Sequence, residues 1–432
     1  MRFPDTIFAL SSGAPPAGVA VIRLSGTGVR FALEMIFGRV PEARRASYGS
    51  LRDLDGLVLD HGLVLFFPEG ASVTGEDVGE VHVHGGRATV AAVLDLLSSL
   101  PEFRLAEAGE FTRRAFLNGR MDLLAVEALG DLLVAETELQ LRAAVSSADG
   151  RLRDLYESWR EALLGLRATV EADLDFSDQD DASAIDLGPL RARCEALAGV
   201  MRAHLDLYAR SEIVRSGYRV ALVGAPNAGK SSLLNALAMR DIAIVSPEAG
   251  TTRDLIECAL DLRGQKVVLI DTAGIREAAG PVERIGVQRA LDAASTADLV
   301  LELVDLSSSD PVPHGRGDAV RVWTKADVNP PPDDDMAVSA LTGAGLDRLL
   351  DLIERRATAQ TVAPDTVVPF KRRQVDWIQR AAAHLDYGAR AVEAELLAEE
   401  LRLASDALAR LTGRLGVEDV LSTLFGAFCI GK

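Results

Sequence analysis

The first part of the chain alternates short β-branched runs with glycine-containing turns, which is typical of strands in a small α/β domain. Strands are predicted at residues 18–24, 57–67 and 78–83, with helical patterns between them at about 27–37 and 87–100. The pattern ends near Asn118 and Gly119. We therefore predict an N-terminal α/β domain over residues 1–119.

From Leu123 the pattern changes to long amphipathic helices rich in alanine, leucine, glutamate and arginine, which favour helix formation. These helices are predicted at 123–148, 151–174, 189–210, 372–391 and 392–411, and a last helix leads into the tail. This composition predicts an all-α helical domain made of two separate parts, residues 120–216 and 359–432.

The middle of the chain, residues 217–358, again alternates strand and helix signals. Its predicted strands are short apolar runs at 219–223, 266–270, 299–304 and 320–323, as in the buried strands of a mostly parallel sheet. We therefore predict a multidomain protein in which an α/β domain is inserted into the helical domain.

Composition narrows the class of protein. The chain is 48% hydrophobic, but its apolar runs are far shorter than the roughly 18 residues that a membrane span needs. The N-terminus lacks the apolar stretch of a signal peptide, and three cysteines without metal-ligand spacing suit a reducing compartment. We expect a cytoplasmic protein with no membrane contact.

The net charge of −18 argues against broad non-specific nucleic-acid binding, which requires a basic surface. The charge is uneven, because residues 1–120 carry 12 basic and 14 acidic residues. A polyanion is therefore expected to meet a local patch in the N-terminal part.

A glycine-rich motif follows the predicted strand 219–223 and opens a predicted helix at 231–238. It reads Gly224-Ala225-Pro226-Asn227-Ala228-Gly229-Lys230-Ser231 and fits the P-loop pattern in the context that this pattern requires. Its backbone N–H groups can cradle a polyphosphate, Lys230 can reach the terminal phosphates, and Ser231 can hold Mg²⁺. The inserted domain is thus predicted to be a P-loop domain.

Three further motifs follow in the order typical of Ras-like GTPases. Asp271-Thr272-Ala273-Gly274 comes after a strand and can act on Mg²⁺ and the terminal phosphate, and residues 250–254 supply a threonine for the metal. Thr324-Lys325-Ala326-Asp327 offers Asp327 as acceptor for guanine, although such enzymes normally have asparagine where Thr324 stands. Each motif alone would more often be an ordinary turn. Together they predict a GTP-hydrolysing domain and disfavour an ATPase or kinase.

The motifs leave two questions undecided: the role of residues 339–341 and the group that orients the attacking water. Ser339-Ala340-Leu341 either completes the guanine pocket or is only the end of a strand. Ile275 stands where Ras-like enzymes use a glutamine to orient water, so another group must do so. Residues 276–284 contain candidates, and the alternative is a solvated charge cluster.

The motifs of the whole chain resemble one family, the MnmE (TrmE) tRNA uridine-5-carboxymethylaminomethyl modification GTPases. Besides the GTPase motifs, the resemblance rests on residues 5–9 (Asp-Thr-Ile-Phe-Ala), 21–26, 74–78, 82–86, 109–119 and the terminal 429–432 (Cys-Ile-Gly-Lys). A generic GTPase would share only the central block.

The resemblance implies a site for a formyl- or methylene-tetrahydrofolate in the N-terminal domain. At matching positions its contacts are Arg23, Glu80, Arg120 and Lys432, although Arg120 stands where the family usually has lysine. The resemblance also implies that Cys429 lies by the one-carbon group. Without it, the two arginines would be surface ion-pair residues and Cys429 an inert buried thiol.

The resemblance further implies a K⁺ ion beside the GTP phosphates when two GTPase domains pair, and a glutamate, Glu283, that orients water. The implied ligands are Ser231 and Thr252 for Mg²⁺, and Asn227, Ser246, Glu248 and Thr251 for K⁺. The residues assigned to GTP binding are Asn227, Ala228, Gly229, Lys230, Ser231, Ser232, Ser246, Thr251, Thr252, Asp271, Thr272, Ala273, Gly274, Thr324, Lys325, Asp327, Ser339, Ala340 and Leu341.

The function implied by the resemblance is that of a homodimeric, K⁺-stimulated GTPase. Together with the flavoprotein MnmG it would add a carboxymethylaminomethyl or aminomethyl group at C5 of the wobble uridine of certain tRNAs. The competing hypothesis is a ribosome-assembly GTPase that binds RNA as a switch and modifies nothing. That hypothesis predicts a basic RNA-binding appendage, whereas this chain ends in Cys-Ile-Gly-Lys after acidic helices.

Overall fold

A computed structural model describes residues 3–176, 186–240, 242–244, 256–271, 295–307, 319–332, 335–363, 365–415, 425–426, 428 and 430–431. The chain forms two compact units. One unit contains Met1–Gly130 together with Ala409–Lys432, and the other contains Asp131–Leu408.

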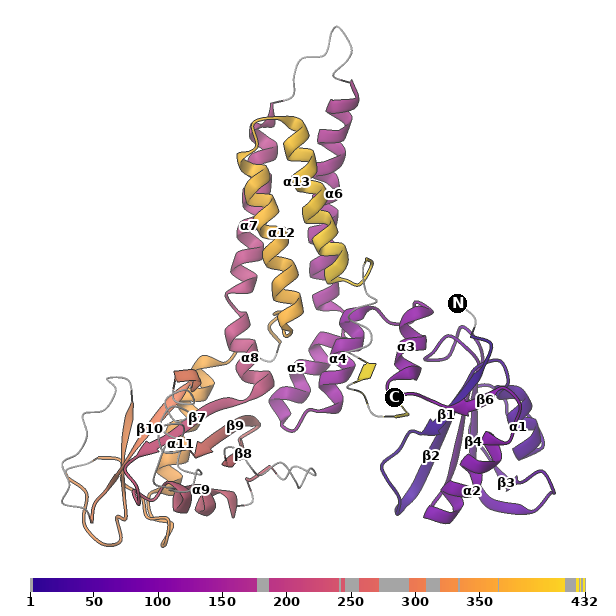
Figure 1. Cartoon of the computed structure of the whole chain (residues 1–432), viewed down its shortest axis with the longest axis horizontal. Coiled ribbons are helices and arrows are strands. Elements are labelled where there is room, and N and C mark those ends of the chain that lie inside the picture. Colours follow the sequence, from indigo (N-terminus) through magenta and orange to yellow (C-terminus); the bar gives the residue numbers. More distant parts are fainter. Residues whose placement is uncertain are drawn as a thin grey trace, which may run out of the picture. The chain divides into compact units, whose positions relative to one another are not determined.

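The N-terminal unit is built on a six-stranded sheet with the order β3-β4-β5-β2-β1-β6. Its strands are β1 Thr6–Leu10, β2 Ala17–Ser25, β3 Ser47–Arg52, β4 Val58–Phe67, β5 Val78–Gly85 and β6 Phe103–Leu105. Neighbouring strands are antiparallel except for β1 and β6, which are parallel. Helices α1 (Val29–Phe37) and α2 (Arg87–Ser98) cover one face of this sheet (Figure 1). The predicted N-terminal α/β fold is therefore confirmed.

The two faces of this sheet differ sharply. Ile22 and Leu24 of β2 and Val81 of β5 are fully buried under α1 and α2, because alternate residues of a strand point to the same side. On the opposite side, Val19 is 57% exposed and Tyr48 is 70% exposed. Part of the second face thus keeps large apolar side chains in solvent.

The C-terminal residues belong to this N-terminal unit. Ile430 forms an isolated antiparallel bridge with Ala108, and the Ser11 hydroxyl donates to the Gly431 carbonyl at 2.8 Å. Phe425 and Phe428 pack with Val126 in a small buried cluster. The unit is therefore assembled from both ends of the chain.

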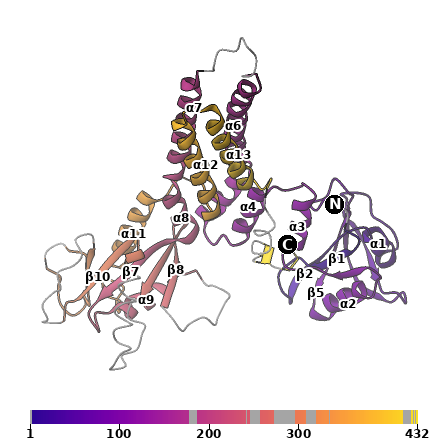
Figure 2. The same ribbon diagram turned by 45° about the horizontal axis from the view of Figure 1, so that its top comes forward.

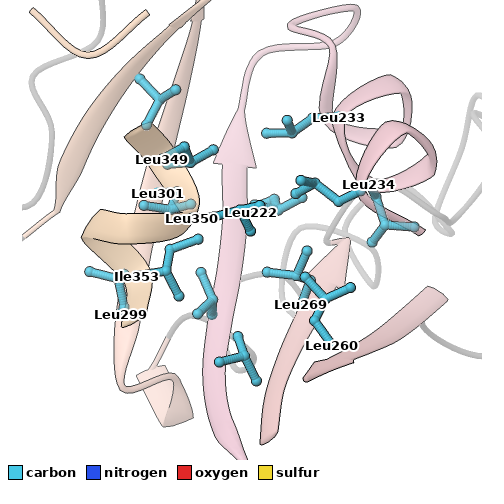
Figure 3. Packing of buried hydrophobic residues seen from close by; sticks show 14 of the residues in the cluster. Leu222, Leu233, Leu234, Leu260, Leu269, Leu299, Leu301, Leu349, Leu350 and Ile353 are labelled. Carbon is cyan, nitrogen blue, oxygen red and sulfur yellow. The ribbon is translucent and has the colours of Figure 1, made fainter. Parts of the chain in front are cut away.

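The second unit contains a five-stranded sheet with the order β11-β10-β7-β9-β8. Its strands are β7 Tyr218–Gly224, β8 Ile256–Leu262, β9 Gln265–Asp271, β10 Leu299–Asp305 and β11 Val320–Thr324, and all pairs are parallel except β8 with β9. Leu222 of β7 lies at the centre of the core, between Leu234 of α9 (Lys230–Ala238) and Ile353 of α11 (Leu346–Gln360) (Figure 3). The predicted mostly parallel sheet is confirmed.

Helices come both before and after this sheet in the chain, so the α/β domain is inserted in a helical domain as predicted. The helices are α4 Leu123–Leu133, α5 Glu138–Ala148, α6 Arg151–Phe176, α7 Leu187–Leu205, α8 Tyr208–Ser216, α12 Arg372–Arg390 and α13 Ala394–Leu411. The four long ones, α6, α7, α12 and α13, run side by side (Figure 1 and Figure 2). Inside them the Tyr156 hydroxyl lies 3.2 Å from Nε2 of the buried His204.

Two predicted helices are divided. The helix predicted at 123–148 is α4 and α5, because Thr137 begins a new helix in which the Gln140 side chain accepts from the backbone N–H groups of Glu136 and Thr137. The helix predicted at 189–210 ends at Leu205, and α8 follows it. Strands β1, β3, β6 and β8 and the helix α3 (Glu110–Leu117) were not predicted.

Two other expectations concern the cysteines and the absence of membrane-spanning helices. Cys194 and Cys258 are free thiols. In the part of the chain that the structure describes, no helix combines the length and the apolarity that a bilayer crossing needs. The helix expected after residue 411 falls largely outside the described residues.

Candidate functional site

The P-loop connects β7 to α9 at the edge where the parallel strands end. Gly229 has φ 87° directly before α9, a left-handed conformation that glycine adopts at low cost. A β-carbon at Gly224 would lie 2.5 Å from the Leu303 carbonyl oxygen of β10. Glycine is therefore required at Gly224 by the close approach of β10.

Lys230 begins α9 and is folded back over the loop. Its Nζ donates to the carbonyl oxygens of Gly224 and Ala225, each at 2.8 Å, and the residue is only 6% exposed. Burial lowers the pKa of Lys230, and the nearby Asp271 carboxylate opposes this shift. The ammonium group is thus held where it can meet phosphate oxygens cradled by the loop.

Ser231 and Asp271 come together as the motifs predict. The Ser231 hydroxyl donates to Oδ2 of Asp271 at 2.6 Å, and Asp271 is completely buried at the end of β9. Hydroxyl and carboxylate oxygens are the hard ligands that Mg²⁺ prefers, usually with several waters and phosphate oxygens. These two residues therefore fit the protein side of a Mg²⁺–nucleotide site.

Thr324, which replaces the usual asparagine, supports the P-loop. Its hydroxyl is buried and lies 2.8 Å from the Ala228 carbonyl oxygen and 3.2 Å from that of Val304. The next residue, Lys325, has φ 59°, and its Nζ pairs with Asp305 at 2.5 Å. Thr324 thus joins the end of β11 to the phosphate loop, an interaction that needs only one hydroxyl.

Asp327 and Ser339 form the remaining part of the site. The fully buried Ser339 donates its hydroxyl to Oδ1 of Asp327 at 2.5 Å. Each carboxylate oxygen has two acceptor positions, so this bond leaves both oxygens able to accept from a ligand. Ala340 is half-buried, whereas Leu341 is 85% exposed. Ser339 is therefore more than a strand end, since it orients the predicted base-binding carboxylate.

Asp327→Asn is expected to weaken GTP binding by roughly 10–100-fold, because the amide cannot accept both guanine donors and a charge-assisted hydrogen bond contributes about 1.5–3 kcal/mol. The variant should gain affinity for xanthosine triphosphate, whose C2 carbonyl can accept from the new amide. Titration of both nucleotides by calorimetry measures the change. Asp347→Asn, at an 87% exposed side chain, is the matched control. An unchanged preference for guanine would contradict the role of Asp327.

The candidate folate residues are only partly brought together. Arg23 of β2 and Glu80 of β5 are directly opposed, with guanidinium–carboxylate distances of 2.9 and 3.0 Å. Their side chains lie on the sheet face away from α1 and α2. Arg120 is exposed and lies beside Gly75, where a β-carbon would lie 3.2 Å from Cγ of Arg120. Of the candidate folate residues, the structure therefore joins Arg23 and Glu80 in an ion pair.

Several predicted site residues lie outside the described part of the chain. They are Ser246, Glu248, Thr251, Thr252, Thr272, Ala273, Gly274, Glu283, Cys429 and Lys432. Asn227 is described: it is exposed in the P-loop with φ 63°. Ser232 is exposed in the first turn of α9.

A buried charge network in the N-terminal unit was not predicted. Arg114 of α3 is completely buried and pairs with Asp5 at 2.8 Å, Glu110 at 3.1 Å and Glu76 at 3.2 Å. Arg104 pairs with Glu110 at 2.6 Å. Burial alone would raise the pKa of Glu110, but hydrogen bonds from Arg104, a backbone N–H and Arg114 outweigh it and hold the pKa at about 2.

This network joins the separate N-terminal motifs that the sequence singles out. Ser25 donates to Glu76 at 2.7 Å, and its hydroxyl lies 2.7 Å from that of Thr74. The Asn118 amide donates to the Thr74 carbonyl oxygen at 2.8 Å. Residues 5, 25, 74–76, 110–114 and 118 thus meet in one place. The signal available in the sequence was the occurrence of Glu110 and Arg114 among the apolar residues of 110–117, which indicates buried charges that pair with each other.

Comparison with known families gives matches along nearly the whole chain. Residues 6–120 match the GTP-binding protein TrmE N-terminus, and residues 123–429 match the MnmE helical domain. The tRNA modification GTPase MnmE of Chelativorans sp. (strain BNC1) is 49% identical over 436 residues, which cover 99% of this chain and 98% of that protein. The protein of the same name from Mesorhizobium japonicum is 48% identical over 440 residues, covering 99% of each chain.

Solved structures match a smaller share of the chain. A substituted form of Aquifex aeolicus Era bound to GDP.AlF4- is 24% identical, with coverage of 38% of this chain and 66% of that chain and a TM-score of 0.26. The G domain of the T. maritima FeoB iron transporter is 26% identical, with coverage of 32% and 98% and a TM-score of 0.25.

Proposed function

This chain belongs to the MnmE family and is a GTP hydrolase, and from this premise we propose that it drives a tRNA modification in the cytoplasm. With the flavoprotein MnmG it adds a carboxymethylaminomethyl or aminomethyl group at C5 of the wobble uridine of certain tRNAs. The observation that carries the proposal is identity of 48–49% over the full length of relatives named tRNA modification GTPase MnmE.

Within the GTPase site, each described residue has one task. Lys230 neutralises charge on the terminal phosphates, and Asp327, oriented by Ser339, accepts from guanine. Ser231 would hold Mg²⁺, with Asp271 acting on it from the end of β9, and the ion would supply positive charge that offsets the charge developing on the phosphates. Thr252 is the further proposed contact to the metal. Thr324 fixes the loop that presents these groups.

The N-terminal unit is proposed to bind a tetrahydrofolate derivative and to form a homodimer. Arg23 and Glu80 offer a cation and a carboxylate side by side, with 23% and 18% of their side chains exposed, so a ligand carrying both donors and acceptors can engage them. Both lie on the sheet face that also exposes Val19 and Tyr48. Large apolar side chains around a polar centre suit a surface that pairs with a second copy.

The remaining proposed folate contacts are Arg120 and Lys432, with Cys429 beside the one-carbon group. Glu283 is proposed to orient the attacking water, since Ile275 has no hydrogen-bonding side chain. Asn227, Ser246, Glu248 and Thr251 are proposed to hold K⁺, which would neutralise charge where other GTPases use an arginine finger.

Hydrolysis is therefore expected to be stimulated by potassium. Turnover should fall by roughly tenfold or more when Na⁺ replaces K⁺ at equal ionic strength, because a missing counter-charge destabilises the transition state. Asn227→Ala, at the exposed loop position, should abolish the difference between the two salts. Steady-state phosphate release measures both effects. Equal wild-type rates in the two salts would remove K⁺ from the mechanism.

Reconstitution tests the proposed function directly. The full chain is incubated with MnmG, a tRNA transcript, a reduced folate one-carbon donor, glycine or ammonium, and GTP, and the digested RNA is analysed by mass spectrometry. A modified uridine should form with GTP and fail to form with a non-hydrolysable analogue. Unmodified tRNA together with tight binding to ribosomal RNA would instead support the ribosome-assembly GTPase.

A further inference from the structure

The helical bundle carries its charge unevenly. Helices α7 and α12 together contain seven arginines and three acidic residues, whereas α6 and α13 contain six arginines and ten acidic residues. The two basic helices are neighbours, as are the two acidic ones (Figure 1 and Figure 2). Arg202 of α7 bonds Asp386 of α12 at 2.5 Å across the contact between the two basic helices. A chain of net charge −18 thus has one basic side to its bundle.

The outer surface of α12 concentrates this charge, and we call it the α12 face. It consists of Arg372, Asp376, Arg380, Ala383, Tyr387 and Arg390, which follow each other at helical spacings of three or four. All six are exposed or half-exposed. Residues on the opposite side of the helix, such as Ile378 and Leu385, are buried. The stripe runs along a helix of about 28 Å.

Two of its arginines have no carboxylate partner within the described ranges. Arg372 pairs with Asp376 at 3.0 Å, but Arg380 and Arg390 form no ion pair there. Arg380 instead stacks over the ring of Trp377, with its guanidinium 4.5 Å from the ring centre. These cations are therefore available to an external anion, and the Arg380 guanidinium already lies over an aromatic ring.

An exposed aromatic ring interrupts the basic stripe. Tyr387 is 60% exposed, and the small Ala383 lies one turn before it on the same face. Exposed rings among arginines are a platform on which unpaired bases stack, while the guanidinium groups contact phosphates. In a chain of net charge −18, most of the surface repels a polyanion, so unpaired cations on one face give a polyanion a place to approach.

We propose that the α12 face is the RNA-docking surface of this protein, taking an unpaired loop of its tRNA substrate. The inference rests on the proposed function and names the part of the molecule that meets the RNA. It differs from the expectation that a polyanion would meet the N-terminal part of the chain. Phosphates pair with Arg372, Arg380 and Arg390, and one unstacked base lies on Tyr387.

The test uses fluorescence anisotropy of a labelled tRNA transcript with the full chain at several salt concentrations. The triple variant R372E/R380E/R390E should bind at least tenfold more weakly than wild type. The slope of log K against log salt is negative, and its magnitude should decrease by about 2, since three phosphate contacts are lost and each contributes about 0.7–0.9. Tyr387→Ala should weaken binding by roughly 5–100-fold while leaving the salt slope unchanged, because a stacking contact releases no counterion.

The matched control is R153E/R167E/R402E, which makes the same change in net charge on α6 and α13. It should bind tRNA within about threefold of wild type. GTP hydrolysis without RNA, measured on every variant, checks that the fold is intact.

Three results would overturn the proposal. Equal losses in both triple variants would mean that only net charge matters. Loss of the MnmG complex with unchanged tRNA binding would assign the α12 face to a protein partner. Wild-type chain that binds no tRNA would overturn the docking site and the proposed function together, whereas the other two outcomes leave the proposed function standing.

Discussion

Lys230→Met is expected to lower kcat/KM for GTP hydrolysis by roughly 10³-fold. The ammonium group is the only described cation inside the P-loop, where its Nζ lies 2.8 Å from two loop carbonyls. Methionine keeps the length of the side chain but removes the charge that stabilises the developing phosphate charge. Single-turnover phosphate release at saturating GTP separates this loss from weaker binding.

A second lysine provides the control for this experiment. Lys266 is the second residue of β9 in the same domain and pairs with Glu136 at 2.5 Å, away from the P-loop. Lys266→Met should hydrolyse GTP at nearly the wild-type rate. If the two variants lost activity equally, the defect of Lys230→Met would reflect folding and the assignment of Lys230 would be wrong.

Arg114→Met is expected to destabilise the N-terminal unit by about 3–5 kcal/mol, the usual cost of removing one partner from a buried ion pair. Glu110 is 1% exposed and would lose one of its three guanidinium partners, while Asp5 and Glu76 would also lose a contact. Hydrogen-exchange mass spectrometry of the full chain measures the change as faster amide exchange in β1 and α3.

The neighbouring Arg113 is a matched control for this substitution. Its side chain is 36% exposed, pairs with the exposed Glu107 at 3.1 Å and makes only a longer contact of 3.6 Å with Glu110. Arg113→Met should therefore cost about 1 kcal/mol or less. Similar protection in the two variants would show that burial of Arg114 contributes little. A loss confined to Arg114→Met would establish the network as a main support of the unit.

The same network makes stability depend on pH. The folded pKa of Glu110 is about 2, below its ordinary value of 4.5. Because the folded pKa is depressed, the stabilisation is fully present above about pH 4.5 and is lost as the pH falls through 2. The pKa of Asp5 is lowered as well: burial raises it, but Arg114 and Arg104 more than compensate. Arg114 and Arg104 therefore set the acid limit of this unit.

The parts of the fold that could be predicted are those whose signal is local. The P-loop, β7 and β9 were predicted because an apolar run and a phosphate-binding motif adjoin in sequence. The α4–α5 break was missed because Leu, Ala and Glu continue through it, and only the cap at Thr137 marks the new helix. Strand β8 was missed because it carries Glu257 and Asp261 among its apolar residues.

In the candidate site too, some contacts could be predicted from the sequence and others could not. Ser231 and Asp271 are 40 residues apart, yet motif order predicted their meeting because the ends of adjacent parallel strands share one edge. The role of Thr324 needed the structure, since sequence alone placed it near the base and its hydroxyl instead holds Ala228. Arg114 lies 109 residues from Asp5, and no local pattern relates the two.

The pairing of Ile430 with Ala108 has a consequence for how the protein is made. Phe425 follows Gly130 by about 295 residues, which a ribosome adds in roughly 15–60 s. During that interval the nascent N-terminal unit has its sheet and its Arg114 network but lacks Phe425 and Phe428, which later cover Val126. An apolar surface on the emerging chain therefore stays uncovered until Phe425 and Phe428 are synthesised. Chaperone demand should consequently rise sharply for chains truncated before Phe425, even though the lesion lies hundreds of residues from the domain it leaves unfinished.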